Sequence, residues 1–127
     1  MNERLTTTPL LNEHCLYLER IVREGEISPQ LSRAAWNALV DIREVVGPNL
    51  DVPDAIPGVD GKLFYTWKRG DHYLELEMLP DGSGEFFYRN AQDGETWSEG
   101  YTLGGVLPGR PIAKLQLFQQ AVRSTVD

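Results

Sequence analysis

The sequence has few cysteines and no long apolar run, and each scarcity narrows the classes of protein to which it can belong. The single cysteine, Cys15, cannot form an internal disulfide, which favours a reducing compartment and predicts a cytoplasmic location. No apolar run approaches the roughly 20 residues that a membrane-spanning helix needs. Residues 1–8 lack the apolar segment of a signal peptide. We therefore expect no membrane partner and no secretion.

Motifs for cofactor, phosphate and metal binding are also missing. Neither a GxxxxGK[ST] nor a GxGxxG pattern occurs. The two histidines, His14 and His72, have no second histidine or cysteine at a spacing typical of metal ligands. No feature marks any serine as a nucleophile. These absences predict a protein that is not an enzyme and uses no cofactor and no metal.

The length and composition are those of an ordinary folded domain. The 127 residues fit one domain, residues 1–127, which can bury roughly two-thirds of its unfolded surface. The content of 41% hydrophobic and 24% charged residues is typical of globular proteins. A core without disulfides is therefore expected.

The net charge of −7 is unevenly distributed along the chain. Residues 1–50 carry a balance of −2, residues 51–101 carry −7, and residues 102–127 carry +2. An acidic middle segment repels phosphate backbones, which argues against direct nucleic-acid binding. It would attract a basic protein surface, although acidic charge also serves solubility alone.

Apolar spacing predicts three helices. Thr8 and Pro9 begin the first and Gly25 ends it, whereas Ser28-Pro29 begins the second and Gly47-Pro48 ends it. Pro111 begins the third. The apolar stripes of the three helices are, in order, Leu11, Cys15, Leu18 and Val22; then Leu31, Ala35, Ala38, Leu39, Ile42 and Val46; then Ile112, Leu115, Phe118 and Val122, with Ala121 alongside.

Four β-rich runs, at about 62–69, 72–79, 84–90 and 95–101, give the clearest pattern. Each separator between them contains a glycine, at Gly70, Gly82 or Gly94, as tight hairpins require. The turn lengths set the register: Leu63–Met78, Tyr65–Leu76, Trp67–Leu74, Leu76–Phe86, Leu74–Tyr88 and Tyr88–Trp97.

All of these paired residues are apolar and share one face of the sheet, which the three predicted helices can cover. The sequence therefore predicts an α+β fold. It contains a four-stranded antiparallel meander with one face covered by helices, in the order α-α-β-β-β-β-α. Residues 47–61 contain three prolines and three glycines, which exclude a regular helix or a central strand, so we expect a connector there.

The opposite face of this sheet is the candidate binding site. The register places on it Phe64, Thr66, Lys68, Tyr73, Glu75, Glu77, Glu85, Phe87, Arg89, Thr96 and Ser98. Glu77 falls opposite Glu85, an unfavourable like-charge pair. Aromatic residues mixed with charge are typical of protein-binding surfaces. We expect the contacts to involve Phe64, Tyr73, Glu75, Glu77, Glu85, Phe87 and Arg89, although the same face could simply be solvated.

Other candidate residues have plainer explanations. Neighbouring helix positions point about 100° apart, so His14 and Cys15 do not face each other. We expect Cys15 in the core and His14 at the surface. We expect His72 to be a solvated turn residue, and we interpret Arg69-Gly70-Asp71 as hairpin chemistry.

Residues 51–101 also carry a resemblance. Asp60-Gly61, Tyr65, Trp67, the LELEML run, Asp81-Gly82 and FFYRNAQDGETW resemble a strand-and-turn pattern in small uncharacterised bacterial and phage-like proteins. The resemblance implies no activity. Some such proteins are encoded in small gene pairs, which would fit a binding partner.

Three functions follow as hypotheses. The first is an interaction or accessory module that docks a protein partner, of basic character, or a second copy of itself. The second is a small-molecule or metal-binding module, or an enzyme, at the sheet–helix edge near His72, Glu99, Tyr101 and Arg110. The third is an acidic inhibitor or nucleic-acid mimic with two rows of carboxylates about 6–7 Å apart. We favour the first.

Overall fold

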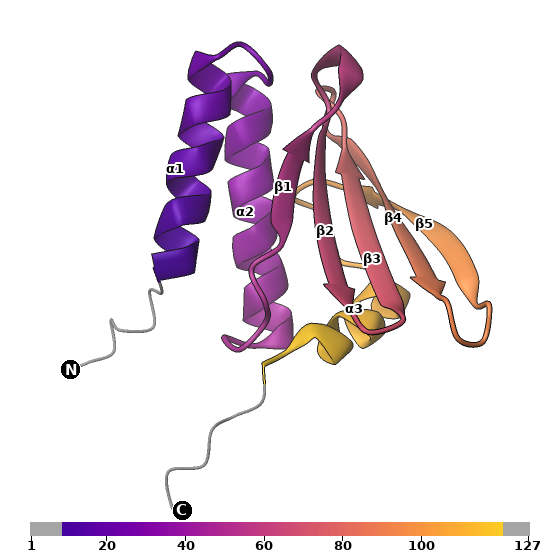
Figure 1. Ribbon diagram of the computed structural model, residues 1–127. Helices are drawn as coiled ribbons and strands as arrows, with labels where there is room; N and C mark the ends of the chain where they lie inside the picture. Colours follow the sequence, from indigo (N-terminus) through magenta and orange to yellow (C-terminus); the bar gives the residue numbers. More distant parts are fainter. Residues whose placement is uncertain (1–8, 121–127) are drawn as a thin grey trace, which may run out of the picture.

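A computed structural model describes residues 9–120 as three helices and one antiparallel sheet (Figure 1). The elements are α1 (Pro9–Arg23), α2 (Pro29–Val46), β1 (Asp54–Pro57), β2 (Leu63–Arg69), β3 (His72–Met78), β4 (Ser83–Asn90), β5 (Thr96–Thr102) and α3 (Gly109–Leu115). Short 3₁₀ segments occupy Val59–Gly61 and Gln116–Phe118. The strands lie in the sheet in sequence order, β1-β2-β3-β4-β5. The predicted α+β class is therefore confirmed.

The predicted register of the meander is confirmed at each of its six pairs. Trp67 lies opposite Leu74, Leu74 opposite Tyr88, and Tyr88 opposite Trp97. Gly70, at φ 58°, adopts the left-handed conformation that its two-residue turn requires. Local turn chemistry and the two-residue side-chain period are sufficient to set this alignment.

The prediction of four strands was wrong, because the sheet has five. Residues 54–57 of the expected connector form β1, which pairs with β2 from Asp54 opposite Thr66 to Pro57 opposite Leu63. Proline excludes a central strand, but an edge strand needs ladder hydrogen bonds on one side only. The order of elements is therefore α-α-β-β-β-β-β-α.

The helices cover the face of the sheet that carries Trp67 and Leu74, which we call the core face. Helix α2 begins as expected, with the Leu31 amide donating to Ser28 Oγ at 3.0 Å. Its packing on the sheet is shown by Tyr65, whose hydroxyl donates to the Ala35 carbonyl at 2.8 Å. Thr8, the expected cap of α1, lies outside the described residues. The buried sheet side chains are Leu63, Tyr65, Trp67, Leu74, Leu76, Met78, Phe86, Tyr88 and Tyr101.

The last helix is shorter than its apolar spacing predicts. It begins at Gly109, two residues before Pro111, and helical geometry ends with the 3₁₀ segment at Phe118. Gln119 is extended and bridges to Leu50. The expected positions Ala121 and Val122 lie outside the described residues. Pairing with a segment distant in sequence therefore ends this helix.

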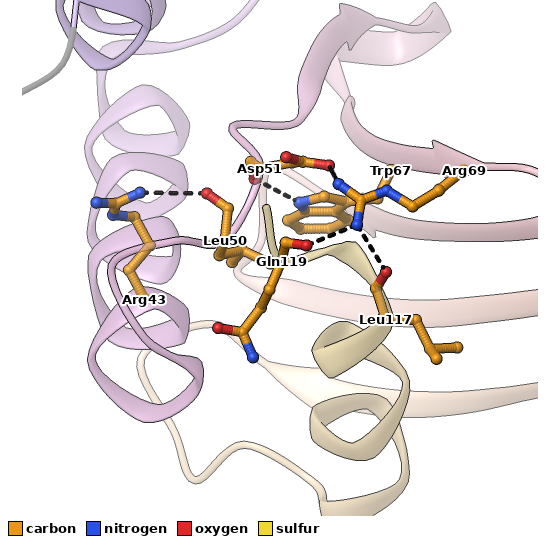
Figure 2. Close-up of polar contacts among 7 residues, drawn as sticks. All are labelled: Arg43, Leu50, Asp51, Trp67, Arg69, Leu117 and Gln119. Atoms are coloured by element: carbon orange, nitrogen blue, oxygen red, sulfur yellow. Dashed lines mark hydrogen bonds and ion pairs between the residues drawn. The ribbon is translucent and has the colours of Figure 1, made fainter. Parts of the chain in front are cut away.

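Arg69 joins three segments at this end of the fold (Figure 2). Its Nη1 donates to the carbonyls of Leu117, at 3.2 Å, and Gln119, at 2.6 Å, and its Nη2 contacts Asp51 Oδ2 at 2.7 Å. Trp67 Nε1 donates to the Asp51 carbonyl at 2.9 Å. Arg69 thus serves tertiary structure, holding the segment after α3 and the start of the β1 lead-in against β2.

Candidate functional site

The side of the sheet away from the helices forms what we call the open face. Its predicted members on β2 to β5 are all exposed or half-buried, whereas most of their neighbours on the core face are buried, Trp97 and Glu99 of β5 being half-buried. Strand β1 adds two residues that sequence reasoning missed, Ile56 opposite Phe64 and Asp54 opposite Thr66. Ile56 is 49% exposed and extends the apolar part of this face. The period-2 alternation of β1 was the available signal, but its prolines obscured it.

Tyr73 and its neighbours form a connected aromatic line on the open face. The ring of Tyr73 meets that of Phe87 edge-on, with centroids 6.4 Å apart, and the Arg89 guanidinium lies 5.4 Å from the Tyr73 ring centroid. The Tyr73 hydroxyl donates to Glu75 Oε1 at 2.7 Å. Burial and then this hydrogen bond to a carboxylate raise the pKa of Tyr73 to about 12. These contacts hold the rings and charges of the face in defined positions.

The predicted like-charge pair is present and is partly compensated. Glu77 lies opposite Glu85 on the neighbouring strand. The Lys62 ammonium contacts Glu77 Oε2 at 2.8 Å, and the hydrogen bond and charge of Glu77 raise the pKa of Lys62. Lys62 also lies 5.8 Å from the Phe64 ring centroid. Glu85 is exposed and has no ion-pair partner among residues 9–120, so it remains available to an incoming cation.

The acidic excess of residues 51–101 is only partly on the open face. Four acidic residues lie in turns or the 3₁₀ segment, namely Asp60, Asp71, Asp81 and Asp93. Three more form ion pairs elsewhere, in Asp51–Arg69, Glu95–Lys114 and Glu99–Arg110. The face itself is polarised along the strands: its rows run from Glu77 and Glu85 at one end to Lys68 and Arg89 at the other.

His14 is buried, so its prediction as a surface residue was wrong. It is only 6% exposed, and its Nε2 lies 3.1 Å from the Tyr65 hydroxyl. Because Tyr65 donates its single hydroxyl hydrogen to Ala35, His14 Nε2 must be the donor and Nδ1 the unprotonated nitrogen. Desolvation lowers the pKa of His14 to about 4. The signal was present, since His14, Leu18 and Ile21 follow the i, i+4, i+7 spacing of a buried stripe.

Cys15 is half-buried, so its prediction as a core residue was also wrong. The buried stripe of α1 passes through His14, which turns Cys15 toward the outer side of the helical pair. Its Sγ lies 3.9 Å from Glu19 Oε2. A shallow hollow of about 400 Å³, lined by Cys15 and Trp36 among others, lies there between α1 and α2.

The four residues proposed as a site at the sheet–helix edge, His72, Glu99, Tyr101 and Arg110, do not all lie together. Arg110 Nε lies 3.6 Å from Glu99 Oε1. Tyr101 is aligned through the sheet with Met78 at the end of β3, whereas His72 begins that strand, so about 20 Å of strand separates them. His72 is partly buried, contrary to expectation, with its Nδ1 2.7 Å from the Tyr88 hydroxyl.

A hollow of about 470 Å³ lies between α1 and β1, and sequence reasoning did not anticipate it. Its lining includes Leu10, Glu13, His14, Asp54 and Ile56. Within residues 9–120, no three His, Cys, Asp or Glu side chains gather where they could hold a metal ion. In the same part of the chain, none of the helices has the length and apolar character needed to cross a membrane.

Comparisons of the chain with protein-family models, with curated proteins and with solved structures found no match. The resemblance of residues 51–101 to small bacterial and phage-like proteins therefore stays a prediction. The functional argument rests on the geometry of the open face.

Proposed function

We propose that the protein is a non-enzymatic interaction module that docks a protein partner on the open face. The observation that carries this proposal is the placement of three half-buried aromatic residues, Phe64, Tyr73 and Phe87, between carboxylates and cations on an uncovered sheet. Aromatic anchors surrounded by charge supply most of the binding free energy in protein interfaces. A structural role alone would not require rings on the side away from the core.

The polarity of the face defines the partner. Basic residues of the partner would meet Glu75, Glu77 and Glu85, and an acidic group would meet Arg89. The Arg89–Tyr73–Phe87 line is already ordered by its own contacts, so docking would fix few additional rotamers. The partner proposed is therefore a protein with a basic patch beside an apolar one. A nucleic-acid mimic is less well supported, because Phe87 and Arg89 interrupt the second row of carboxylates on β4.

Co-purification from extract of the source cells, quantified by mass spectrometry, tests this function. The variant Glu75→Lys/Glu77→Lys/Glu85→Lys should lose the partner, as should Phe87→Ala. The matched control is Glu24→Lys/Glu44→Lys/Asp71→Lys, which changes net charge equally at exposed sites off the face. Circular dichroism verifies that each variant is folded. Retention of the same partner by the folded open-face variants would refute the proposal.

Small-molecule binding is a second candidate, favoured by the hollow between α1 and β1. His14 lines this hollow, Glu13 and Asp54 contribute carboxylates, and no lysine or arginine is among the lining residues. An apolar ammonium compound would suit this lining. Titration with benzylamine, followed by ¹⁵N–¹H spectra, should shift the amides around His14. Shifts spread evenly over the surface would reject this site.

A further inference from the structure

The two edge strands of the sheet, β1 and β5, differ in whether their outward backbone groups can pair with another strand. The backbone groups of an edge strand that face outward can pair with another strand unless they are removed or covered. The Gly58 amide donates to the Lys62 carbonyl, so the even-numbered residues of β1 direct their backbone groups toward β2. The backbone groups of Pro53, Ala55 and Pro57 therefore point away from the sheet. Two of these three residues have no N–H to donate. The β1 edge is therefore protected against pairing.

The β5 edge has no such protection. The Asn90 amide donates to the Glu95 carbonyl, and the Leu103 amide donates to the Gly82 carbonyl. The backbone N–H and C=O groups of the odd-numbered residues of β5 therefore point toward β4. Thr96, Ser98 and Gly100 then present their N–H and C=O groups outward. No hydrogen bond among the described residues uses these groups. The strand contains no proline, no lysine and no bulge, and its one charged residue, Glu99, is paired with Arg110. Helix α3 contacts β4, and Figure 1 shows β5 at the edge of the sheet away from α1 and α2.

We infer that β5 pairs with β5 of a second copy of the chain, in antiparallel orientation across a two-fold axis at Ser98. This register places Ser98 opposite Ser98 of the second copy and Thr96 opposite Gly100. All six outward N–H and C=O groups of each strand are then used, which makes six hydrogen bonds between the two chains. The result is a continuous ten-stranded sheet, with both open faces on the same side.

The neighbouring symmetric registers are less favourable. An axis at Glu99 would set two carboxylates directly opposite each other. It would also require the Thr102 carbonyl, which already accepts from the Gly105 amide at 2.8 Å. An axis at Trp97 would pair Gly100 with the β4–β5 turn and lose part of the ladder. An axis at Ser98 gives a hydrogen-bond partner to every outward N–H and C=O group of Thr96, Ser98 and Gly100.

Charge complementarity supports a second copy as the occupant. In the Ser98 register, Glu99 of one copy lies opposite Trp97 of the other. The Arg110 guanidinium lies 4.7 Å from the Trp97 ring centroid and, at 3.6 Å, already contacts Glu99 of its own chain. Each arginine would thus lie between two carboxylates. The two carboxylates of the strand and its approach are already paired with cations, Glu99 with Arg110 and Glu95 with Lys114, so the overall charge of −7 is not concentrated at this contact.

Sedimentation-equilibrium measurements on the full chain test this pairing. The expected result is a concentration-dependent rise from 14.3 kDa toward twice that mass. Ser98→Pro removes an outward N–H in each chain without touching the β4–β5 ladder, and should raise the dissociation constant at least about tenfold. The matched control is Ala55→Pro, the same change at the outward position of β1, which should leave association unchanged.

Two further variants keep the test decisive if Ser98→Pro fails to fold. Ser98→Lys places like charges opposite each other and should also give monomers. Ser98→Cys in a Cys15→Ser background should form a disulfide-linked dimer on oxidation, because paired Cα atoms about 5.5 Å apart are within disulfide range. Monomer at every concentration would overturn the inference, as would a dimer unaffected by both Ser98 variants. Because this pairing uses backbone groups of β5, whereas the proposed partner contacts lie on β2 to β4, either proposal can fail without the other.

Discussion

His14 and Tyr65 are joined in the interior by a hydrogen bond whose direction is set by a third group. Tyr65 donates to the Ala35 carbonyl at 2.8 Å, so its oxygen accepts from His14 Nε2 at 3.1 Å. This chain of two hydrogen bonds links α1, β2 and α2. The chain requires a proton on His14 Nε2, and desolvation of the buried ring favours its neutral form, so the packing of the helices on the sheet is sensitive to pH.

We expect the free energy of unfolding to fall as the pH drops from about 6.5 toward 4. The pKa of His14 is lowered to about 4 in the folded protein, so in this window the unfolded chain binds a proton that the folded protein does not. The loss should reach up to about 3 kcal/mol at the acidic end. Urea titrations of the wild type and of His14→Gln between pH 4 and 7 measure it. The variant should lose this slope, whereas Cys15→Ser should keep it.

Tyr65→Phe should destabilise the protein at neutral pH by about 1–3 kcal/mol, because it leaves a buried acceptor at Ala35 and a buried donor at His14 unpaired. Thermal or urea unfolding measures the change. In a double-mutant cycle with His14→Gln, the two effects should fall short of additivity, since both substitutions break the same chain. Strict additivity would show that the two side chains do not interact.

Arg69→Ala should cost about 1–2 kcal/mol and loosen the segment after α3, because three charge-assisted hydrogen bonds are lost from a partly exposed site. Amide exchange should accelerate at Asp51 and Gln120, whose N–H groups bond across the same junction. Arg69→Lys should restore only part of the protection, since an ammonium cannot reproduce the fork of donors. Unchanged exchange at both amides would contradict this role.

Tyr73 should remain protonated well above pH 10, because burial and the Glu75 carboxylate raise its pKa to about 12. Between these values the unfolded chain loses the phenolic proton before the folded protein does, so stability should decline as the pH rises. Absorbance at 295 nm follows the titration, and Tyr73→Phe identifies its contribution by difference. Glu75→Gln should move the transition toward lower pH. A Tyr73 transition near pH 10 in the wild type would contradict both the partial burial of Tyr73 and its contact with Glu75.

Local sequence determined most of the sheet and most of the open face. A turn length and a glycine at each hairpin set the register of β2 to β5, and the two-residue period then assigns every side chain to one face. Phe64, Tyr73, Glu77 and Phe87 could therefore be placed together without any knowledge of the helices. These relations depend on residues close in sequence, which is why they could be predicted.

The tertiary structure decided what depends on distant segments. Residues 54–57 pair with β2 as an edge strand, where proline is tolerated. The helical segment after α3 ends where Gln119 pairs with Leu50. The tertiary structure buried His14, because only the sheet supplies Tyr65 as a partner. It also separated the acidic residues into turns, ion pairs and the end of the open face near Glu77. Each outcome depends on a contact between residues that are distant in sequence. The spacing of apolar residues along the chain reflects only local structure, so it does not predict such contacts.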